Sequence, residues 1–583
     1  MPTPIQLFDS YQKQIITLDP AKTVISNTLK IYSCGPTVYN YMHIGNLRAT
    51  WLGDTIARVG KLAGWHTQWI SNITDVGHLV DDGDDGEDKL EKGAKRENKN
   101  VQDIINFYTD DYLKQCQAIG IEIPTGIMRP KATEYIEEQM ILSLELLIAD
   151  KAYLLEDGIY FDSSNNQAIF GSSDFLITEP LRTILETQAK QRAGQSNQFT
   201  DRDTKNTTKN PSDFALWKFV SADSLQKWRF VDFFDAKDVL AGSYREILEK
   251  WGCPGWHSEC VAMISAIAGQ DTPLIEGAGG DSSFSFDPFK NKTVIDLHLG
   301  GEDHIDVHHK NEILQSEALG FHLSKYWVHN KFVLVNGKKM SKSLGNVFLV
   351  VGKYADTGFY SLENPPQEVQ DKFKIKGFDP LAYRLMLMEH HYTQQMDFTW
   401  DKLAQSQARL FNLRKLGTKI SKVVQNINVS ISDQDKGLPK MQEYNNKLIS
   451  DLVNNLNFPL FLEVVTNEMN RLFGSISKSS IKGSYNKEHE DWDLSIDNLD
   501  EADFFHDFAV LIDWMDKGLL NLNLFDGCDN WTIETLAIQR QQAKEVKNWA
   551  EADRLRVEIA KLGYQVDDYP WGYGLWWNPT LMD

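Results

Sequence analysis

The stretch LKIYSCGPTVYNYMHIGN, Leu29–Asn46, indicates how the first part of the chain folds. Its first six residues, Leu29–Cys34, are mostly apolar and predict a short buried strand, which a polar, turn-rich loop follows. From Asn46 onward apolar residues recur at helical spacing as far as Gly64, and Thr67–Thr74 indicates a second strand. Strand, helix and strand in succession predict a crossover unit of a parallel sheet, whose ligands bind beyond the carboxyl ends of its strands. The loop that follows the first strand occupies that position.

Length and composition predict several globular domains. The chain has 583 residues, of which 42% are hydrophobic and 24% charged, and this is too long for a single hydrophobic core. The formal net charge of −22 argues against a general affinity for nucleic acid, so any RNA site must be local. We expect no membrane span and no secretory signal, because no apolar stretch is long enough. Five scattered cysteines favour a reducing cytoplasm over a disulfide framework.

Several further segments have a readable pattern. Thr293–Gly301 and Lys331–Gly337 are apolar runs that end in glycine and predict strands. Residues after about 380 turn helical and predict a bundle that extends to about Leu524. Ile533–Gly563 predicts a strongly helical stretch before an aromatic-rich tail.

Four other segments carry few large apolar side chains or many acidic ones. We interpret 187–211 and 277–292 as surface insertions in a larger nucleotide-binding domain. The acidic runs at 81–88 and 488–503 are interpreted as solvated loops.

His43-Ile44-Gly45-Asn46 stands where the loop meets the predicted helix. A helix N-terminus offers unpaired N–H groups and positive potential, so phosphate would bind there. An ordinary capping turn, with Asn46 as the cap, explains the same residues equally well.

A second candidate phosphate site is the loop KKMSKSLGN, Lys338–Asn346. It follows a predicted strand and carries three lysines within five residues, flanked by hydroxyl groups and glycine. Lysine ammonium groups stabilise the charge that spreads onto a leaving pyrophosphate. A solvated basic loop is the alternative interpretation.

Together, HIGN and KMSKS in this order resemble the signatures of class I aminoacyl-tRNA synthetases. The resemblance implies that His43, Gly45 and Asn46 bind ATP, and that Lys339 and Lys342 stabilise the transferring centre. Asn46 stands where many relatives carry a second histidine. Because an asparagine amide still donates hydrogen bonds, we expect altered detail without lost function.

His308 and Glu312 are four residues apart, so a helix would present both side chains to one metal ion. For this pair alone, an ordinary surface helix is the more common explanation. The segments YSCGPTVYNYMHIGN, GWHSECVAM and HHKNE nevertheless resemble cysteinyl-tRNA synthetases, in which the matching positions hold zinc. The resemblance implies one Zn²⁺ per chain, held by Cys34, Cys260, His308 and Glu312.

Zinc suits the selection of cysteine because it binds sulfur strongly and favours the thiolate, which a serine hydroxyl does not imitate. Four protein ligands normally close a zinc site, whereas catalysis needs an open position. Our hypothesis is that Glu312 is the weak ligand, which leaves room for the sulfur of the substrate.

The same resemblance suggests substrate and RNA contacts. Trp256, His298 and Thr74 are expected to enclose the amino acid; a structural role in the core is the alternative for Trp256 and the histidine. The C-terminal segment KEVKNWAEADRLRVEIAKLGYQVDD resembles an anticodon-reading module. There Trp549 would stack on a base, and the carboxylates of Asp553 and Asp568 would accept hydrogen bonds from base edges. Lys544 stands where relatives are expected to carry arginine, which puts bidentate base recognition at that position in doubt.

These patterns predict a multidomain chain: an α/β Rossmann-like parallel-sheet catalytic domain with insertions, an α-helical bundle and a small C-terminal anticodon-binding module. The resemblance implies a cytoplasmic monomer that uses ATP with Mg²⁺, L-cysteine and tRNA(Cys). Two alternatives are a cysteine ligase acting on an amino sugar and an inactive zinc-containing interaction protein. The expected segments are 1–135 and 246–345 for the two halves of the catalytic domain, 136–245 for a connective insertion, 346–400 for a connecting, stem-contact-like region, 401–530 for the bundle, and 531–583 for the anticodon module.

Overall fold

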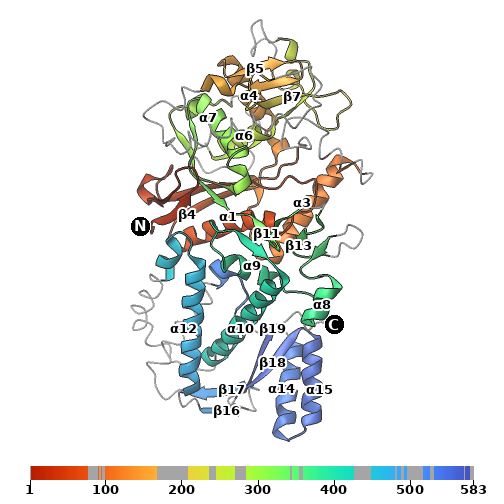
Figure 1. The fold of residues 1–583 in the computed structure, drawn as a ribbon. Coiled ribbons are helices and arrows are strands. Elements are labelled where there is room, and N and C mark those ends of the chain that lie inside the picture. Colours follow the sequence, from red (N-terminus) through yellow and green to blue (C-terminus); the bar gives the residue numbers. More distant parts are fainter. Residues whose placement is uncertain are drawn as a thin grey trace. The chain divides into compact units, whose positions relative to one another are not determined.

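The computed structural model consists of two compact units (Figure 1). The first comprises Met1–Lys114 and Glu122–Phe332, and the second comprises Gln115–Ile121 and Val333–Asp583. The division falls within helix α3 (Val101–Ala118). The residues described are 2–76, 90, 93–94, 99–166, 208–234, 245–268, 284–341, 344–352, 359–425, 448–478, 482–486, 491–495, 516–524, 531–569 and 572–577.

A four-stranded parallel sheet forms the centre of the first unit, with the strand order β10-β9-β3-β4. Helix α1 connects β3 to β4, which confirms the predicted crossover unit. Gly64, at a positive φ of 87°, follows the end of this helix as expected. The elements are β3 (Thr28–Ser33), α1 (Ile44–Leu62), β4 (His66–Ser71), β9 (Thr293–Gly301) and β10 (His322–Asn330).

The order in which strands are added to the sheet reverses between the neighbouring parallel strands β3 and β9, and this switch point places the site. From β3 the chain continues to β4 on one side, and from β9 it continues to β10 on the other. Open α/β sheets bind ligands at such a point, beyond the carboxyl ends of the two strands, which here are β3 and β9. Cys34 stands at this point, and its N–H donates to the Leu299 carbonyl of β9 at 3.2 Å.

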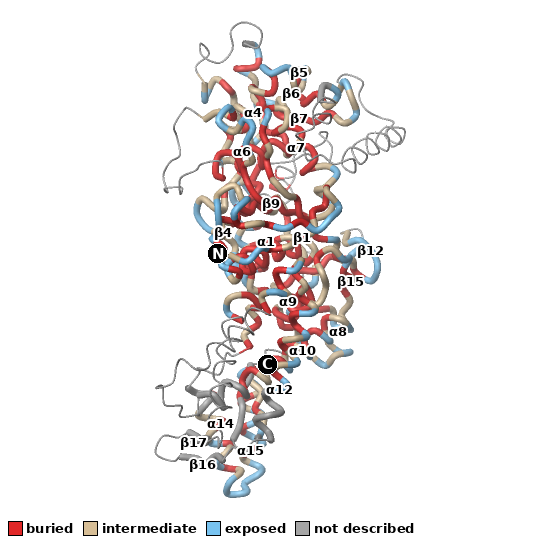
Figure 2. Tube along the Cα trace, turned by 90° about the vertical axis from the view of Figure 1, so that its left-hand side faces the viewer, coloured by how far each residue is buried: buried red, intermediate tan, exposed pale blue. Residues whose placement is uncertain are grey.

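An antiparallel sheet, with the order β5-β6-β7-β8, belongs to the same unit. Its apolar residues share one core with α4 and α6, and with residues of the parallel sheet such as Tyr32 and Trp327. Strand β9 and helix α6 are almost wholly buried (Figure 2). The remaining elements are β1 (Ile5–Asp9), β2 (Gln14–Leu18), α4 (Ile136–Ile148), β5 (Ala152–Leu155), β6 (Gly158–Phe161), β7 (Phe214–Phe219), β8 (Gly252–Pro254), α6 (Trp256–Ala268) and α7 (His308–Ala318).

The second unit is mainly helical after residue 380, as expected, but it also contains short strands that were not expected. Strand β15 (Met396–Phe398) pairs in parallel with β11 (Val333–Val335), a partner that local periodicity does not reveal. The hairpin of β16 (Lys482–Asn486) and β17 (Asp491–Ser495) is a second exception. The other elements are β12 (Lys338–Lys339), β13 (Phe348–Leu349), β14 (Tyr360–Ser361), α8 (Gln367–Phe373), α9 (Pro380–Met388), α10 (Trp400–Gln425) and α12 (Phe458–Lys478).

The C-terminal part of the second unit is a helical hairpin followed by a β-hairpin (Figure 1). The predicted single helical stretch is interrupted, because Lys547 adopts a positive φ of 60° and the Asn548 side chain caps a new helix. Ile533, Ala537, Ile559, Val566 and Leu575 form its small apolar core. The elements are α14 (Trp531–Glu545), α15 (Trp549–Lys561), β18 (Tyr564–Tyr569) and β19 (Gly572–Trp577).

Several predicted segments are not covered by this description. The acidic run 81–88, most of 187–211, and 277–283 of the second proposed insertion lie outside the described residues. Within the part of the chain that is described, no helix combines the length and apolar character needed to cross a bilayer.

Candidate functional site

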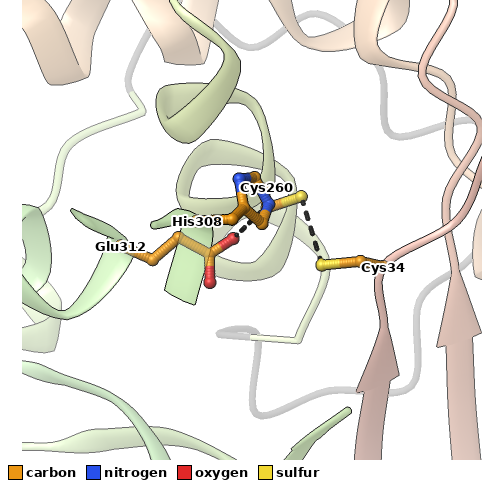
Figure 3. A group of neighbouring side chains, drawn as sticks. All are labelled: Cys34, Cys260, His308 and Glu312. Atoms are coloured by element: carbon orange, nitrogen blue, oxygen red, sulfur yellow. Dashed lines mark hydrogen bonds and ion pairs between the residues drawn. The ribbon is translucent and has the colours of Figure 1, made fainter. Parts of the chain in front are cut away.

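Four side chains from three segments converge at the carboxyl end of β3 (Figure 3). Cys34 directly follows that strand, Cys260 lies on α6, and His308 and Glu312 lie one turn apart on α7. Their sulfur, nitrogen and oxygen atoms all lie within 4.8 Å of one another. Cys260, His308 and Glu312 are almost completely buried, and Cys34 is half-buried. The structure therefore brings together the four residues that sequence similarity suggested.

The distances in this cluster suit a small tetrahedral cation. The two cysteine sulfurs are 3.9 Å apart, and His308 Nε2 lies 3.0 Å from Glu312 Oε1. Two zinc–sulfur bonds of about 2.3 Å at a tetrahedral angle would separate the sulfurs by about 3.8 Å. Two sulfurs, one imidazole nitrogen and one carboxylate oxygen are a donor set that zinc prefers.

The Glu312 carboxylate lies between the imidazole rings of His298 and His308, but it forms no hydrogen bond of good geometry with either ring. Its oxygens lie 2.9 Å from His298 Nε2 and 3.0 Å from His308 Nε2, yet neither oxygen has a hydrogen-bond partner. Contacts this short, but with poor hydrogen-bond angles, are expected where the lone pairs of neighbouring groups point toward the same space. A buried carboxylate in that situation is costly unless a cation compensates it.

His257 orients the His308 ring. The Nδ1 atoms of the two rings are 3.1 Å apart, which leaves His308 Nε2 facing the cluster. Metal-binding histidines commonly use their other ring nitrogen in this way. The Trp256 ring stacks on His308 with a centroid distance of 4.4 Å.

Without a metal ion, two of the four side chains favour the deprotonated form that binds a cation, and two favour the protonated form. Although burial alone lowers the pKa of His308, the Glu312 carboxylate and Cys260 raise that pKa to about 10. A hydrogen bond from Cys34 is the main cause that lowers the pKa of Cys260 to about 6. Burial opposes ionisation of Glu312, but His298 and His308 hold its pKa below the usual range. Burial raises the pKa of the Cys34 thiol, so a divalent cation would have to displace the protons of Cys34 and His308 when it binds.

Three histidines beside the cluster were missed by sequence reasoning. His309 Nε2 lies 3.3 Å from Cys34 Sγ, and His309 Nδ1 lies 2.7 Å from His329 Nε2. Burial lowers the pKa of His309 well below its ordinary value, so the ring is neutral. His304 packs edge-on against both His308 and His309. The adjacent histidines His308 and His309 could have been noticed in the sequence. His329 lies on strand β10, and no local pattern connects it with that pair.

Two other predicted substrate residues lie in the same unit. His298 is completely buried and stacks on Trp327 with a centroid distance of 4.7 Å. Thr74 is buried, and its hydroxyl accepts a hydrogen bond from the Asn72 amide at 3.1 Å. Asn72 in turn accepts from the Gly35 N–H at 2.7 Å, which connects Thr74 to the residue after Cys34.

The HIGN motif forms the N-terminus of α1, with a cap that differs from the expectation. His43, not Asn46, is the capping residue, because its Nδ1 accepts from the N–H groups of Gly45 and Asn46 at 3.1 and 3.3 Å. The Asn46 side chain completes the box by accepting from the His43 N–H at 3.1 Å. The two polar side chains are thus fixed at a helix end that favours anions.

The lysine loop belongs to the second unit. Lys339 is exposed at the end of β12, whereas Lys342 lies outside the described residues. Asn346 braces the loop, since its Oδ1 accepts from the Ser341 N–H at 2.8 Å and its Nδ2 donates to the Lys339 carbonyl at 3.2 Å.

In the C-terminal hairpin, Trp549 is 59% exposed and Asp553 is also exposed. Asp568 is engaged already: Arg540 donates two hydrogen bonds to its carboxylate at 2.7 and 2.8 Å, and Lys544 lies 2.7 Å from it. An RNA base would therefore have to replace one of these contacts at Asp568.

Known proteins similar to this chain agree with these features. Residues 20–357 match the family described as tRNA synthetases class I (C) catalytic domain. Cysteine–tRNA ligase 1 of Burkholderia lata is 30% identical over 583 aligned residues, which cover 98% of this chain and 97% of the relative. The cysteine–tRNA ligase of Novosphingobium aromaticivorans is 29% identical and covers 97% of this chain and 95% of its own. The chain belongs to the class I cysteine–tRNA ligase family.

Membership of the cysteine–tRNA ligase family makes the chain an enzyme of the ligase class. A solved methionyl-tRNA synthetase of Mycobacterium tuberculosis, in complex with methionyl-adenylate, has a TM-score of 0.50 and covers 90% of this chain and 96% of its own. At 13% identity this likeness shows the fold alone, which is that of class I synthetases with a parallel sheet and surrounding helices.

Proposed function

We propose that this chain activates L-cysteine with ATP and transfers it to the 3′ end of tRNA(Cys). The observation that carries the proposal is the convergence of Cys34, Cys260, His308 and Glu312 at the strand switch point of a family member. When bound there, Zn²⁺ would supply a Lewis acid that prefers thiolate sulfur to a hydroxyl, and so distinguishes cysteine from serine.

In the first step, a carboxylate oxygen of cysteine attacks the α-phosphorus of ATP, and pyrophosphate leaves with the electrons of the broken P–O bond. The positive end of helix α1 would face the phosphates, with the side chains of His43 and Asn46 fixed there by the capping box. Lys339 and Lys342 stabilise the negative charge that develops on pyrophosphate, and Mg²⁺ accompanies the nucleotide. Because these charges matter most in the transition state, their removal lowers the rate more than it weakens cysteine binding.

The amino acid is held beside the cluster while this occurs. Trp256, stacked on His308, forms one wall, and His298 keeps Glu312 in place from the other side. Thr74 is connected to the turn after Cys34 through Asn72 and Gly35. These contacts hold the side chains around the cysteine site in place and take no part in the bond changes.

In the second step, a ribose hydroxyl at the tRNA 3′ end attacks the carbonyl carbon of cysteinyl-adenylate, and AMP leaves. The exposed Trp549 and Asp553 of the C-terminal hairpin would contact the anticodon by stacking and by accepting hydrogen bonds. Asp568 would accept a hydrogen bond from a base edge in the same way, in exchange for one of its contacts with Arg540 and Lys544.

Cysteine-dependent exchange of pyrophosphate into ATP tests the first step, and charging of tRNA(Cys) tests the second. We expect exchange with cysteine and little with serine, and charging in the presence of tRNA. Exchange followed by transfer to an amino sugar in place of tRNA would contradict the proposal. If a metal-loaded preparation showed no exchange at all, the chain would instead be an inactive zinc-containing interaction protein.

A further inference from the structure

A second cavity lies at the amino ends of the central strands, at the other end of β3 from the metal cluster. Its volume is about 440 Å³, and its walls include Lys30 of β3, Thr293 and Val294 at the start of β9, and Ala268 at the end of α6. This volume lies within the range of cavities that bind small molecules. Neither the cysteine cluster nor the phosphate motifs contribute to it.

The cavity is strongly basic in an acidic protein. Lys22, Lys30, Lys292 and Lys325 line it, and among the described lining residues there is no aspartate or glutamate. The whole chain, by contrast, has a formal charge of −22. Four ammonium groups around one cavity repel one another, and the repulsion is relieved when an anion binds between them.

Two carboxylates near the walls compensate only part of this charge. Asp19 lies 3.3 Å from the Lys22 ammonium group. Asp296 accepts from the Lys30 N–H at 2.9 Å and from the Val24 N–H at 2.8 Å. Among the residues that the structure describes, four lysines against these two carboxylates leave an excess of two positive charges.

Two of the four lysines, Lys30 and Lys325, donate hydrogen bonds to backbone carbonyls that explain their positions. Lys30 is 3% exposed, and its ammonium group donates to the Ala268 carbonyl at 2.5 Å, as a cap for the C-terminus of α6. Lys325 donates to the Lys22 carbonyl at 2.6 Å and so fixes the loop before β3. For Lys292, no such contact is found within the described part of the chain.

Apolar groups complete the cavity. Val24, Phe289 and Val294 line it together with the lysines. A ligand with a compact charged group and an uncharged body matches this combination, because the lysines favour the charge and the apolar wall favours the body.

We propose that this cavity binds a small organic phosphate that carries two negative charges. A phosphate monoester has a charge of about −1.5 to −2 near pH 7, which matches the excess of two positive charges. A concave site of this size suits a small molecule better than the backbone of a folded RNA, which proteins contact over extended surfaces. The site is independent of the proposed aminoacylation.

Calorimetric titration of the full chain with glucose 6-phosphate tests the proposal, because this probe is neither substrate nor product of the proposed reaction. Lys22 and Lys292 are exposed, so the double variant Lys22→Ala/Lys292→Ala should keep the unfolding temperature of the unmodified chain. We expect it to bind the probe about tenfold more weakly, since two of the four positive charges around the cavity are removed. Lys290→Ala is the matched control: Lys290 is also exposed, but it pairs with Asp287 at 2.7 Å and does not line the cavity.

Inorganic phosphate, which the proposed reaction neither consumes nor releases, serves as a second probe of charge alone. Binding that weakens with added salt and with the double substitution, but not with Lys290→Ala, supports the site. Unchanged binding in the double variant would overturn the proposal, and so would a failure of both probes to bind at millimolar concentration in low salt. Equal binding of uncharged glucose, or displacement of the probe by a short RNA at lower concentration, would also overturn it.

Discussion

His257 offers a sharp test of the proposed metal centre, because it contacts a candidate ligand without being one. If His308 binds the metal through Nε2, its Nδ1 must carry the proton and donate it to His257 Nδ1, 3.1 Å away. His257→Leu keeps a side chain of similar size in this buried position but removes the acceptor. The His308 ring then has no partner that fixes its orientation and tautomer.

The expected loss follows from the single contact removed. Deleting the outer partner of a metal-binding histidine costs about 10–100-fold in metal affinity, which corresponds to about 1.4–2.7 kcal/mol. His257→Asn should lose much less, because its side-chain oxygen lies near the position of the imidazole Nδ1 and accepts the same proton.

Transfer of zinc to a chromophoric chelator measures the affinity, and thermal unfolding checks that each variant folds. His322→Leu is the control, since His322 pairs with Glu317 at 3.0 Å away from the cluster. Equal zinc affinity in His257→Leu and the unmodified chain would refute the reasoning. An asparagine variant as weak as the leucine variant would show that packing matters and the hydrogen bond does not.

Three further outcomes are expected. Gly35→Ala should slow cysteine-dependent exchange about 100-fold, because the added Cβ would lie 1.6 Å from a backbone oxygen and displace the turn after β3; a rate like that of the unmodified chain contradicts this. Asp379→Ala should lower the free energy of unfolding, measured in urea, by about 3–5 kcal/mol, since it leaves the buried Arg414 guanidinium without the carboxylate that lies 2.5 Å away. The double variant Asp379→Ala/Arg414→Met should recover part of this loss. No recovery would argue against the ion pair. Hydrogen bonds from Arg540 hold the pKa of Asp568 below its usual value of 3.8. The ionised Asp568 therefore stabilises the folded chain fully above pH 3.8, and this contribution is lost as the pH falls through the lowered pKa. Asp568→Asn should therefore destabilise by about 1 kcal/mol at pH 7, given the partial exposure of the carboxylate, and the difference from the unmodified chain should shrink in acid; a difference that stays constant with pH would exclude this ion pair as its source.

Local patterns predicted the first crossover unit and one later strand closely. The apolar run before Cys34, the helical spacing up to Gly64 and the run Thr293–Gly301 all correspond to observed elements. Each depends on side-chain periodicity and on turn residues that act over a few positions. Pairings such as that of Met396 with Val333 join distant strands and leave no comparable trace in a single sequence.

For the candidate site, the sequence alone gave the residue types, the four-residue spacing of His308 and Glu312, and a resemblance that joined them to two cysteines. The contact of Cys34 with His309 and the stack of Trp256 on His308 depend on how helices pack against the sheet. The lysine cavity is a still clearer case, because Lys22 and Lys325 are 303 positions apart and meet only through the parallel pairing of strands β10, β9 and β3. Periodicity and caps are properties of neighbours along the chain, whereas the convergence of charges is a property of the packed sheet.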